Sequence, residues 1–439
     1  MGNLSDISNV SISLLTAAVQ GSDFGTQLIA SPHASSVGRV LTYTQYDATN
    51  PDNLPASTLR ALSDAFSQTP HPASVRVGRL SVDKVTISPV DAVAAAVYSL
   101  KINGTLVSFT ASGSPTQANI ATGLAAAINT AALGVTATAV TTTVELVFTA
   151  GVKPLTAFTK VAYTSITPAA AVTMATDLGA IAAENNNWFV LNLTERTKQR
   201  QIDAAAWTET QDKMFVTSSS EAAIYDGVST TDLAYVLKAS NYFRTALLYS
   251  ASADTEYPDV AWTARMLTVQ PGGDSWHAKQ LSGVTVSPLT ATQHSAILAK
   301  NASTFENYNN LNLTFGGKTS GGEWIDVIRF RDYLKNQIQV DQVTLLVSRE
   351  KIPYTDAGIQ LCASTLKGSL RNGQTSGGIA PDETKANGDP NPGFIVTAPL
   401  SANVSDATKA SHVLSLKFNA RLTGAIHMTT ISGSLTYSI

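Results

Sequence analysis

The alternation of short apolar segments with helical patterns between Val172 and Leu267 constrains the fold of this chain most strongly. Three apolar segments of strand length are separated by segments long enough for helices of about ten residues. The strands are predicted at Trp188–Leu193, Lys213–Ser218 and Arg244–Ser250, and the helices at 173–185, Thr197–Thr210, Asp232–Ser240 and Pro258–Leu267. Apolar strands joined by helices indicate a parallel sheet that is covered on both faces.

Residues 38–80 show a shorter version of the same pattern. A β segment at Gly38–Tyr46 is followed by a helix at Ser57–Ser67 and a strand at Ala73–Leu80. We interpret this order as a βαβ-like opening of the same domain.

Between Lys84 and Pro168 the composition changes to a Thr/Val-rich β pattern. An Asn-Gly turn at 103–104 separates two alternating strands, and "TQANIATGLAAAIN" predicts a short amphipathic helix. We therefore predict a compact α+β module inserted into the larger domain.

The C-terminal part predicts a mixed α+β region. A helix-like segment, "TATQHSAILAKN", precedes two further helices at Ile325–Gln339 and Asp356–Leu370. Three β segments follow a loop rich in Gly, Asp and Pro, and they read "FIVTAP", "HVLSLKFNARL" and "AIHMTTISGSLTYSI". Because Asn9–Val19 also alternates apolar and polar residues, both ends of the chain predict extended β segments.

Charge, hydropathy and cysteine content exclude several classes of function. Charged residues make up 14% of the chain and the net charge is -3, so neither nucleic acid nor an anionic membrane is expected as a partner. We expect other subunits to cover much of so charge-poor a surface. The sequence predicts no membrane span and no secretory signal. The single cysteine, Cys362, precludes an internal disulfide and fits a reducing compartment or a particle assembled in one.

The stretch "FGGKTSGGEWID", Phe315–Asp326, contains a Gly-Lys-Thr sequence typical of phosphate-binding loops. The full signature requires a glycine at the position of Asn312, and a helix that opens at the Lys-Thr pair. Instead, Ser320, Gly321 and Gly322 follow, and these residues do not favour a helix. We interpret the stretch as a glycine-rich hairpin loop between "NLNLTF" and "EWIDVIRF".

Acidic residues near one predicted strand end leave two interpretations open. Asp254, Glu256 and Asp259 could hold Mg²⁺, since carboxylates bind hard cations. They could equally complement the dipole of a helix that begins at Pro258, which is the interpretation we prefer.

No catalytic, cofactor or metal site is predicted. The six histidines lack the spacings of zinc sites, and the turns after the predicted parallel strands lack a dinucleotide fingerprint. The SxxK match at Ser364–Lys367 lies in an ordinary amphipathic helix, where Cys362 is expected to be a buried thiol. The alternating ends instead suggest β-augmentation, in which an arm adds a strand to a neighbour's sheet.

The order of these segments resembles the sheath proteins of contractile bacteriophage tails. "VSISLLTAAVQGSDFGTQLIAS" is similar to the family's N-terminal arm and first strand, and "KINGTLVSFTASGSPTQANIATGLAAAIN" is similar to its protruding module. The later segments of the family are resembled, in order, by "AWTARMLTVQPGGDSWHAKQLSGVTVSPLT", "GGEWIDVIRFRDYLKNQI", "KIPYTDAGIQLCASTLKGSLRNGQTSGGI" and "AIHMTTISGSLTYSI". The chain departs from the commoner pattern by having Arg329-Phe330-Arg331 in place of paired arginines, which indicates a divergent branch.

The resemblance implies an α/β fold, α+β overall, with several domains. Its parts would be an extended N-terminal arm at 1–24, a parallel α/β core domain at 25–83 and 168–309, an inserted protruding module at 84–167, and a C-terminal sheath domain at 310–439 that ends in a β arm.

The resemblance also implies a structural protein with no cofactor. Such subunits form stacked hexameric rings around a tail tube, bind baseplate and tail terminator proteins, and are part of a virion assembled in the host cytoplasm. Intersubunit strands would contain Val10, Ile12 and Leu14 at the front and Ile426, Met428, Thr430 and Ile431 at the back. The basic residues Lys351, Lys367 and Arg371 would contact the tube, or would simply lie on a solvated helix face.

Two other classes remain open from the sequence. A degenerate α/β enzyme or nucleotide-binding protein with an appended β module would be a monomer that a small ligand stabilises. A surface adhesin or pilus-like subunit would need an export signal.

Overall fold

The computed structural model describes residues 23–149 and 151–433. Contacts divide these residues into two compact units, one formed by 23–332 with 424–433 and the other by 333–423. The domain boundaries drawn from the sequence, including 84–167 and 310–439, stay predictions. Within the described part, no helix is both long and apolar enough to span a membrane.

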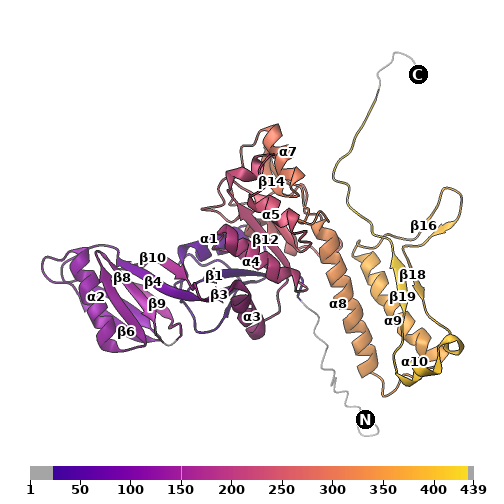
Figure 1. Ribbon diagram of the computed structural model, residues 1–439, viewed down its shortest axis with the longest axis horizontal. Coiled ribbons are helices and arrows are strands. Elements are labelled where there is room, and N and C mark those ends of the chain that lie inside the picture. The colour runs from indigo at the N-terminus through magenta and orange to yellow at the C-terminus, as the bar shows by residue number, and fades with distance from the viewer. Residues whose placement is uncertain (1–22, 150, 434–439) are drawn as a thin grey trace, which may run out of the picture. The chain divides into compact units, whose positions relative to one another are not determined.

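An eight-stranded sheet forms the body of the larger unit (Figure 1). Its inner six strands, from β14 to β3, are parallel, and an antiparallel strand closes each edge. In spatial order the strands are β15 (Leu311–Phe315), β14 (Ser303–Tyr308), β13 (Thr245–Tyr249), β12 (Met214–Ser219), β11 (Val190–Leu193), β1 (Gln27–Pro32), β3 (Val75–Leu80) and β2 (Val40–Tyr43). The predicted α/β class and its three central strands are confirmed.

The opening of this domain differs from the predicted βαβ order. The segment at Gly38–Tyr46 contributes β2, which pairs antiparallel to β3 as the edge strand. The parallel βαβ unit is instead β1, α1 (Ala56–Phe66) and β3, with Leu28 of β1 aligned to Arg76 of β3. Residues of β1 are buried along its whole length, because it lies between β11 and β3.

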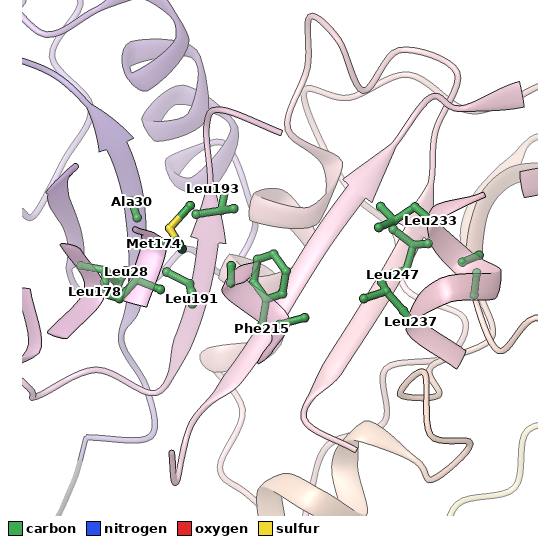
Figure 2. Close-up of a cluster of buried hydrophobic side chains, with 14 of the residues drawn as sticks. Leu28, Ala30, Met174, Leu178, Leu191, Leu193, Phe215, Leu233, Leu237 and Leu247 are labelled. Carbon is green, nitrogen blue, oxygen red and sulfur yellow. The ribbon is translucent and has the colours of Figure 1, made fainter. Parts of the chain in front are cut away.

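Helices cover both faces of the sheet, as the apolar strands require. One face packs against α3 (Met174–Glu184), α4 (Lys198–Glu209), α5 (Leu233–Ala239), the 3-10 helix η2 (Ala222–Tyr225) and α7 (Ala291–Ala299). Figure 2 shows Leu178 of α3 beside Leu28 and Leu191, and Leu237 of α5 beside Leu247, with Phe215 between the two groups. The other face packs against α1, α6 (Pro258–Leu267) and the start of α8 (Ile325–Val347).

A separate core lies in the inserted region. A four-stranded antiparallel sheet, a three-stranded sheet and one helix enclose it. These elements are β4 (Val82–Pro89), β5 (Val97–Ile102), β6 (Thr105–Thr110), α2 (Gln117–Ala131), β7 (Val135–Val140), β8 (Thr143–Phe148), β9 (Leu155–Thr159) and β10 (Val161–Pro168). Asn103 and Gly104 both have positive φ, which is the conformation that a two-residue turn between β5 and β6 requires.

The smaller unit contains the rest of α8, the helix α9 (Asp356–Thr375) and short strands. Thr355 caps α9 by accepting from the amide of Gly358, and buried Ile359, Cys362 and Leu366 form its apolar stripe. The remaining elements are β16 (Glu383–Thr384), β17 (Pro390–Asn391), β18 (Phe394–Thr397), the 3-10 helix η3 (Ser401–Asn403), α10 (Asp406–Ala410) and β19 (Lys417–Ala420).

Candidate assembly surfaces

The smaller unit presents a sheet of only two strands, β18 and β19. They pair antiparallel, with Ile395 opposite Asn419 and Val396 opposite Phe418. Within the described residues no third strand joins this sheet, although the chain just beyond β19 forms a single bridge between Leu422 and Ile379. A two-stranded sheet is marginal by itself, and its outer edges carry backbone groups that can pair with another strand.

Large apolar side chains are exposed around this sheet. Ile395 is 56% exposed on β18 and Phe418 is 40% exposed on β19. The exposed large apolar residues of the smaller unit are Val343, Leu346, Val347, Ile395, Leu400, Val413, Phe418 and Leu422. Ile395 and Phe418 belong to adjacent cross-strand pairs, so they lie on opposite faces of the sheet and both faces carry an uncovered apolar side chain.

The three basic residues predicted for tube contact lie on or next to α9. Lys351 is exposed in the loop before this helix, Lys367 is half-buried and Arg371 is exposed. Lys367 and Arg371 are one helical turn apart and therefore share a face. None of the three forms an ion pair with a residue in the described ranges. Their role in tube contact stays a prediction.

The C-terminal segment 424–433 runs without regular secondary structure as part of the larger unit. Ile426, Met428 and Ile431 are 86%, 81% and 89% exposed, and Thr430 is exposed as well. These are the four residues predicted for an intersubunit strand. The N-terminal residues with the same predicted role, Val10, Ile12 and Leu14, lie outside the described residues.

His427 is the one residue of this segment that packs closely against the larger unit among the described contacts. Its ring stacks on His277 with centroids 4.7 Å apart, and it meets the Trp324 ring edge-on at 4.4 Å. The Ser275 hydroxyl lies 3.1 Å from His427 Nε2. We call Ser275, His277, Trp324 and His427 the histidine clasp.

The histidine clasp was not predicted from the sequence. The alternation that assigned Ile426 and Met428 to an intersubunit strand would also place His427 on the opposite side of an extended segment. That signal was available in the sequence. Its partners were not, because Ser275 and Trp324 come from loops more than a hundred residues earlier in the chain.

Solved structures with a similar fold match nearly the whole chain. The helical sheath of the anti-feeding prophage in its contracted state has a TM-score of 0.55 at 10% identity, and the match covers 98% of this chain and 99% of that chain. A chain of the contracted anti-feeding prophage baseplate matches with the same TM-score, identity and coverage. The contracted sheath complex of PVC, an extracellular contractile injection system, has a TM-score of 0.53 at 8% identity, and 98% of each chain is covered. This chain has a contractile sheath fold.

A family model agrees with this fold in the C-terminal part. The model described as E217 tail sheath protein gp31-like, C-terminal domain, matches residues 325–435. Curated protein sequences give no match. The resemblance to tail sheath proteins is therefore confirmed, and the low identities agree with a divergent branch.

In this sheath fold the glycine-rich stretch connects β15 to α8. The hairpin predicted through it is wrong, because the β hairpin lies one step earlier, between β14 and β15. Gly316 and Gly317 have φ near +107° and +100°, which other residues rarely adopt. A bridge between Lys318 and Trp324 then closes the loop into a tight turn before α8 begins at Ile325.

The amides of this loop already have partners within the protein. The Gly317 amide donates to Ser303 Oγ at 2.9 Å, and the Thr319 amide donates to the Glu323 carbonyl at 2.7 Å. The Ser320 amide donates to the Thr245 carbonyl, and Lys318 Nζ lies over the Trp324 ring, 5.1 Å from its centroid. A phosphate would need these same donors, so the loop is structural.

The acidic residues near Pro258 also have structural partners. Asp259 is fully buried, 2.9 Å from Arg196 Nη1, and accepts from Ser218 Oγ at 2.7 Å. Burial raises the pKa of Asp259, while Arg196 and Ser218 oppose that rise. Glu256 accepts from the amide and hydroxyl of Thr285 at 2.6 and 2.8 Å. Across the described residues, no group of three possible ligands is arranged for a metal ion.

Cys362 is buried, as predicted, on the apolar stripe of α9. Its carbonyl accepts from the side-chain amide of Gln342 on α8 at 3.0 Å. Burial raises the pKa of the thiol, which keeps it protonated and unreactive at neutral pH.

Proposed function

We propose that this chain is the structural subunit of a contractile phage tail sheath. It polymerises as stacked hexameric rings around the tail tube, and contraction drives the tube through the host envelope during genome delivery. The observation that carries this proposal is the agreement of almost the entire chain with contracted sheath subunits.

The open two-stranded sheet supports an assembly role. Strands β18 and β19 leave edge groups and apolar side chains such as Ile395 and Phe418 uncovered in a single chain. A strand added from a neighbour would satisfy the edge groups through main-chain hydrogen bonds and cover part of the apolar surface. The sheet would then have the three or more strands that independent stability requires.

The C-terminal segment has the properties of such a donated strand. Its backbone has no regular secondary structure and no strand partner within the described residues, and Ile426, Met428 and Ile431 are exposed. We assign Val10, Ile12 and Leu14 of the N-terminal segment the same role, on the basis of their alternation. Two donated strands from each subunit would join every ring to its neighbours.

Contraction needs no nucleotide in this proposal. A metastable lattice that gains about one kcal/mol per subunit on shortening gains on the order of a hundred kcal/mol over a hundred subunits. The partners would be the tube protein, the baseplate and the tail terminator, and the particle would be assembled in the host cytoplasm.

Negative-stain electron microscopy of the purified chain tests this function. We expect hollow tubes or rings, and we expect Lys318→Ala to form them as readily as the unmodified chain. A degenerate enzyme or nucleotide-binding protein would instead be a monomer whose melting temperature rises with a nucleotide or another small ligand. A monomer with that ligand response, and with loss of the response in Lys318→Ala, would refute the sheath proposal.

A further inference from the structure

Among the described residues, the ring contacts and the hydrogen bond between the C-terminal segment and the α/β body all involve His427. Its ring stacks on His277 and meets Trp324 edge-on, while Ile426 and Met428 on either side remain exposed. The attachment therefore depends largely on the contacts of one imidazole with two other rings. From this geometry we propose that His427 is an acid-sensitive latch, which holds the C-terminal segment on the body at neutral pH and releases it when the clasp histidines are protonated.

One hydrogen bond at the clasp requires the ring of His277 to be neutral. The amide of Gly316 donates to His277 Nδ1 at 3.3 Å, so this nitrogen must be unprotonated. The ring of His277 also lies edge-on to Phe315, with centroids 4.6 Å apart. A proton on Nδ1 would remove the acceptor for Gly316, and it would place a charge against the stacked ring of His427.

Burial, together with nearby positive charge, disfavours protonation of both rings further. Burial, with a contribution from Lys279, lowers the pKa of His277. Burial also lowers the pKa of His427, with contributions from His277 and Lys279. Lys318, on the loop before α8, is the next cation, since its Nζ lies over the ring of Trp324.

The nearby acidic groups are already engaged elsewhere. Glu323 accepts from the amide of Trp324 at 3.1 Å, and Asp274 is paired with Arg329 at 2.8 Å. On the side of β14, Glu306 lies 2.6 Å from His294, whose ring contacts Phe315. Within the described part of the chain, none of these carboxylates pairs with His277 or His427, so no counter-ion offsets a positive charge in the clasp.

The direction of the pH effect follows from linkage. A histidine whose pKa is lowered in the attached state binds protons more readily after release. Attachment is therefore fully stable above the ordinary histidine pKa of about 6.5 and weakens progressively as the pH falls below it.

An apolar cavity of about 270 Å³ adjoins the clasp and is consistent with a reversible attachment. Leu298, Phe315 and Trp324 form walls on the body, and Met428 closes the side that belongs to the C-terminal segment. Release would therefore open one wall of the cavity without disrupting the core of the sheet.

A fluorescent label on the segment tests the latch without requiring assembly. Thr429→Cys places a thiol two residues from His427, while the native Cys362 is buried and poorly labelled. A bimane on this thiol is quenched by Trp324 when the segment is attached. We expect the bimane emission to rise at least about twofold as the pH falls from 8 to 5, and the midpoint of this rise to lie below about pH 6.5. The comparison is confined to the pH range in which far-UV circular dichroism stays constant.

Four variants of the labelled chain make the outcome decisive. Trp324→Phe should remove the pH-dependent signal, and His71→Phe, a change at an exposed histidine elsewhere, should leave it as in the parent. His427→Ala should be bright at every pH. His277→Phe combined with His427→Phe keeps two aromatic rings in the clasp, neither of which can be protonated, so this double variant should remain quenched throughout. Emission that is independent of pH in the parent, quenching in His427→Ala, or any other behaviour of the double variant would overturn the proposal.

Because the label reports on the single chain, failure of the latch would not bear on the sheath function. Conversely, pH-dependent release of the segment in a chain that forms no tubes would support the latch and contradict only the proposed sheath assembly.

Discussion

Arg329 is a buried arginine that pairs with a buried carboxylate, whereas Arg331, two residues later, is exposed. Its side chain is 1% exposed, and Nη1 lies 2.8 Å from Asp274. Nη2 donates to the carbonyls of Val269 and Phe24 at 2.8 and 3.1 Å. Arg331 has a side chain that is 52% exposed and pairs with Asp332. The sequence identified both arginines as a departure from the sheath pattern, but only the structure distinguishes the buried one.

We expect Arg329→Met to lower the free energy of unfolding by about 3–5 kcal/mol, because it leaves Asp274 buried without its counter-ion. Arg331→Met is the matched control and should cost less than about 1 kcal/mol, because an exposed ion pair contributes little. Urea unfolding of the monomeric protein, followed by tryptophan fluorescence, measures both. Equal losses in the two variants would contradict the assignment of Arg329 as the buried anchor.

At the scale of single elements, the periodicity of the sequence was most informative where strands are buried on both faces. β11, β12 and β13 consist almost entirely of buried residues, so a continuous apolar run was enough to predict them. Edge strands carry no such run. β2 was therefore placed correctly in the sequence, but its antiparallel pairing with β3 could not be inferred from local pattern.

The helix α8 was predicted to end at Gln339 and continues to Val347. Residues 340–347 contain neither glycine nor proline, so local propensity allows the helix to extend until the chain approaches Pro353.

The candidate sites also divide into residues that a local sequence pattern predicts and residues that it does not predict. Alternation predicts an intersubunit strand through Ile426 and Met428, which stays a prediction, whereas the histidine clasp depends on contacts between distant loops.

Helix α9 allows a test of tube contact at the element scale. Reversing both charges, with Lys367→Glu and Arg371→Glu, should abolish assembly on tubes while the helix still folds, since both residues lie outside its buried stripe. Lys101→Glu, at an exposed position of β5, is the control and should assemble normally. Co-sedimentation of the chain with purified tubes measures the effect. If the double variant co-sediments as the control does, these residues belong to a solvated helix face.

For the whole molecule, the N-terminal segment is the part whose role the fold alone does not reveal. We expect a chain lacking Met1–Thr16 to fold as a monomer that cannot form tubes, because it has lost Val10, Ile12 and Leu14. A chain lacking only Met1–Asp6 retains these residues and should still polymerise. Electron microscopy and analytical ultracentrifugation measure the outcome. Ordinary tubes from the longer deletion would exclude the segment from the intersubunit strands.

In the proposed sheath, the sheet formed by β18 and β19 has a consequence for the kinetics of growth. A sheet of two strands is marginally stable, so the first subunits to meet would have to order each other's sheet edges while they bind. A subunit that joins an existing end finds an edge that earlier neighbours have already stabilised. Nucleation is then slow and elongation fast, which gives a critical concentration below which free subunits persist. We therefore expect such a subunit to remain unpolymerised below that concentration until a preformed end is presented to it.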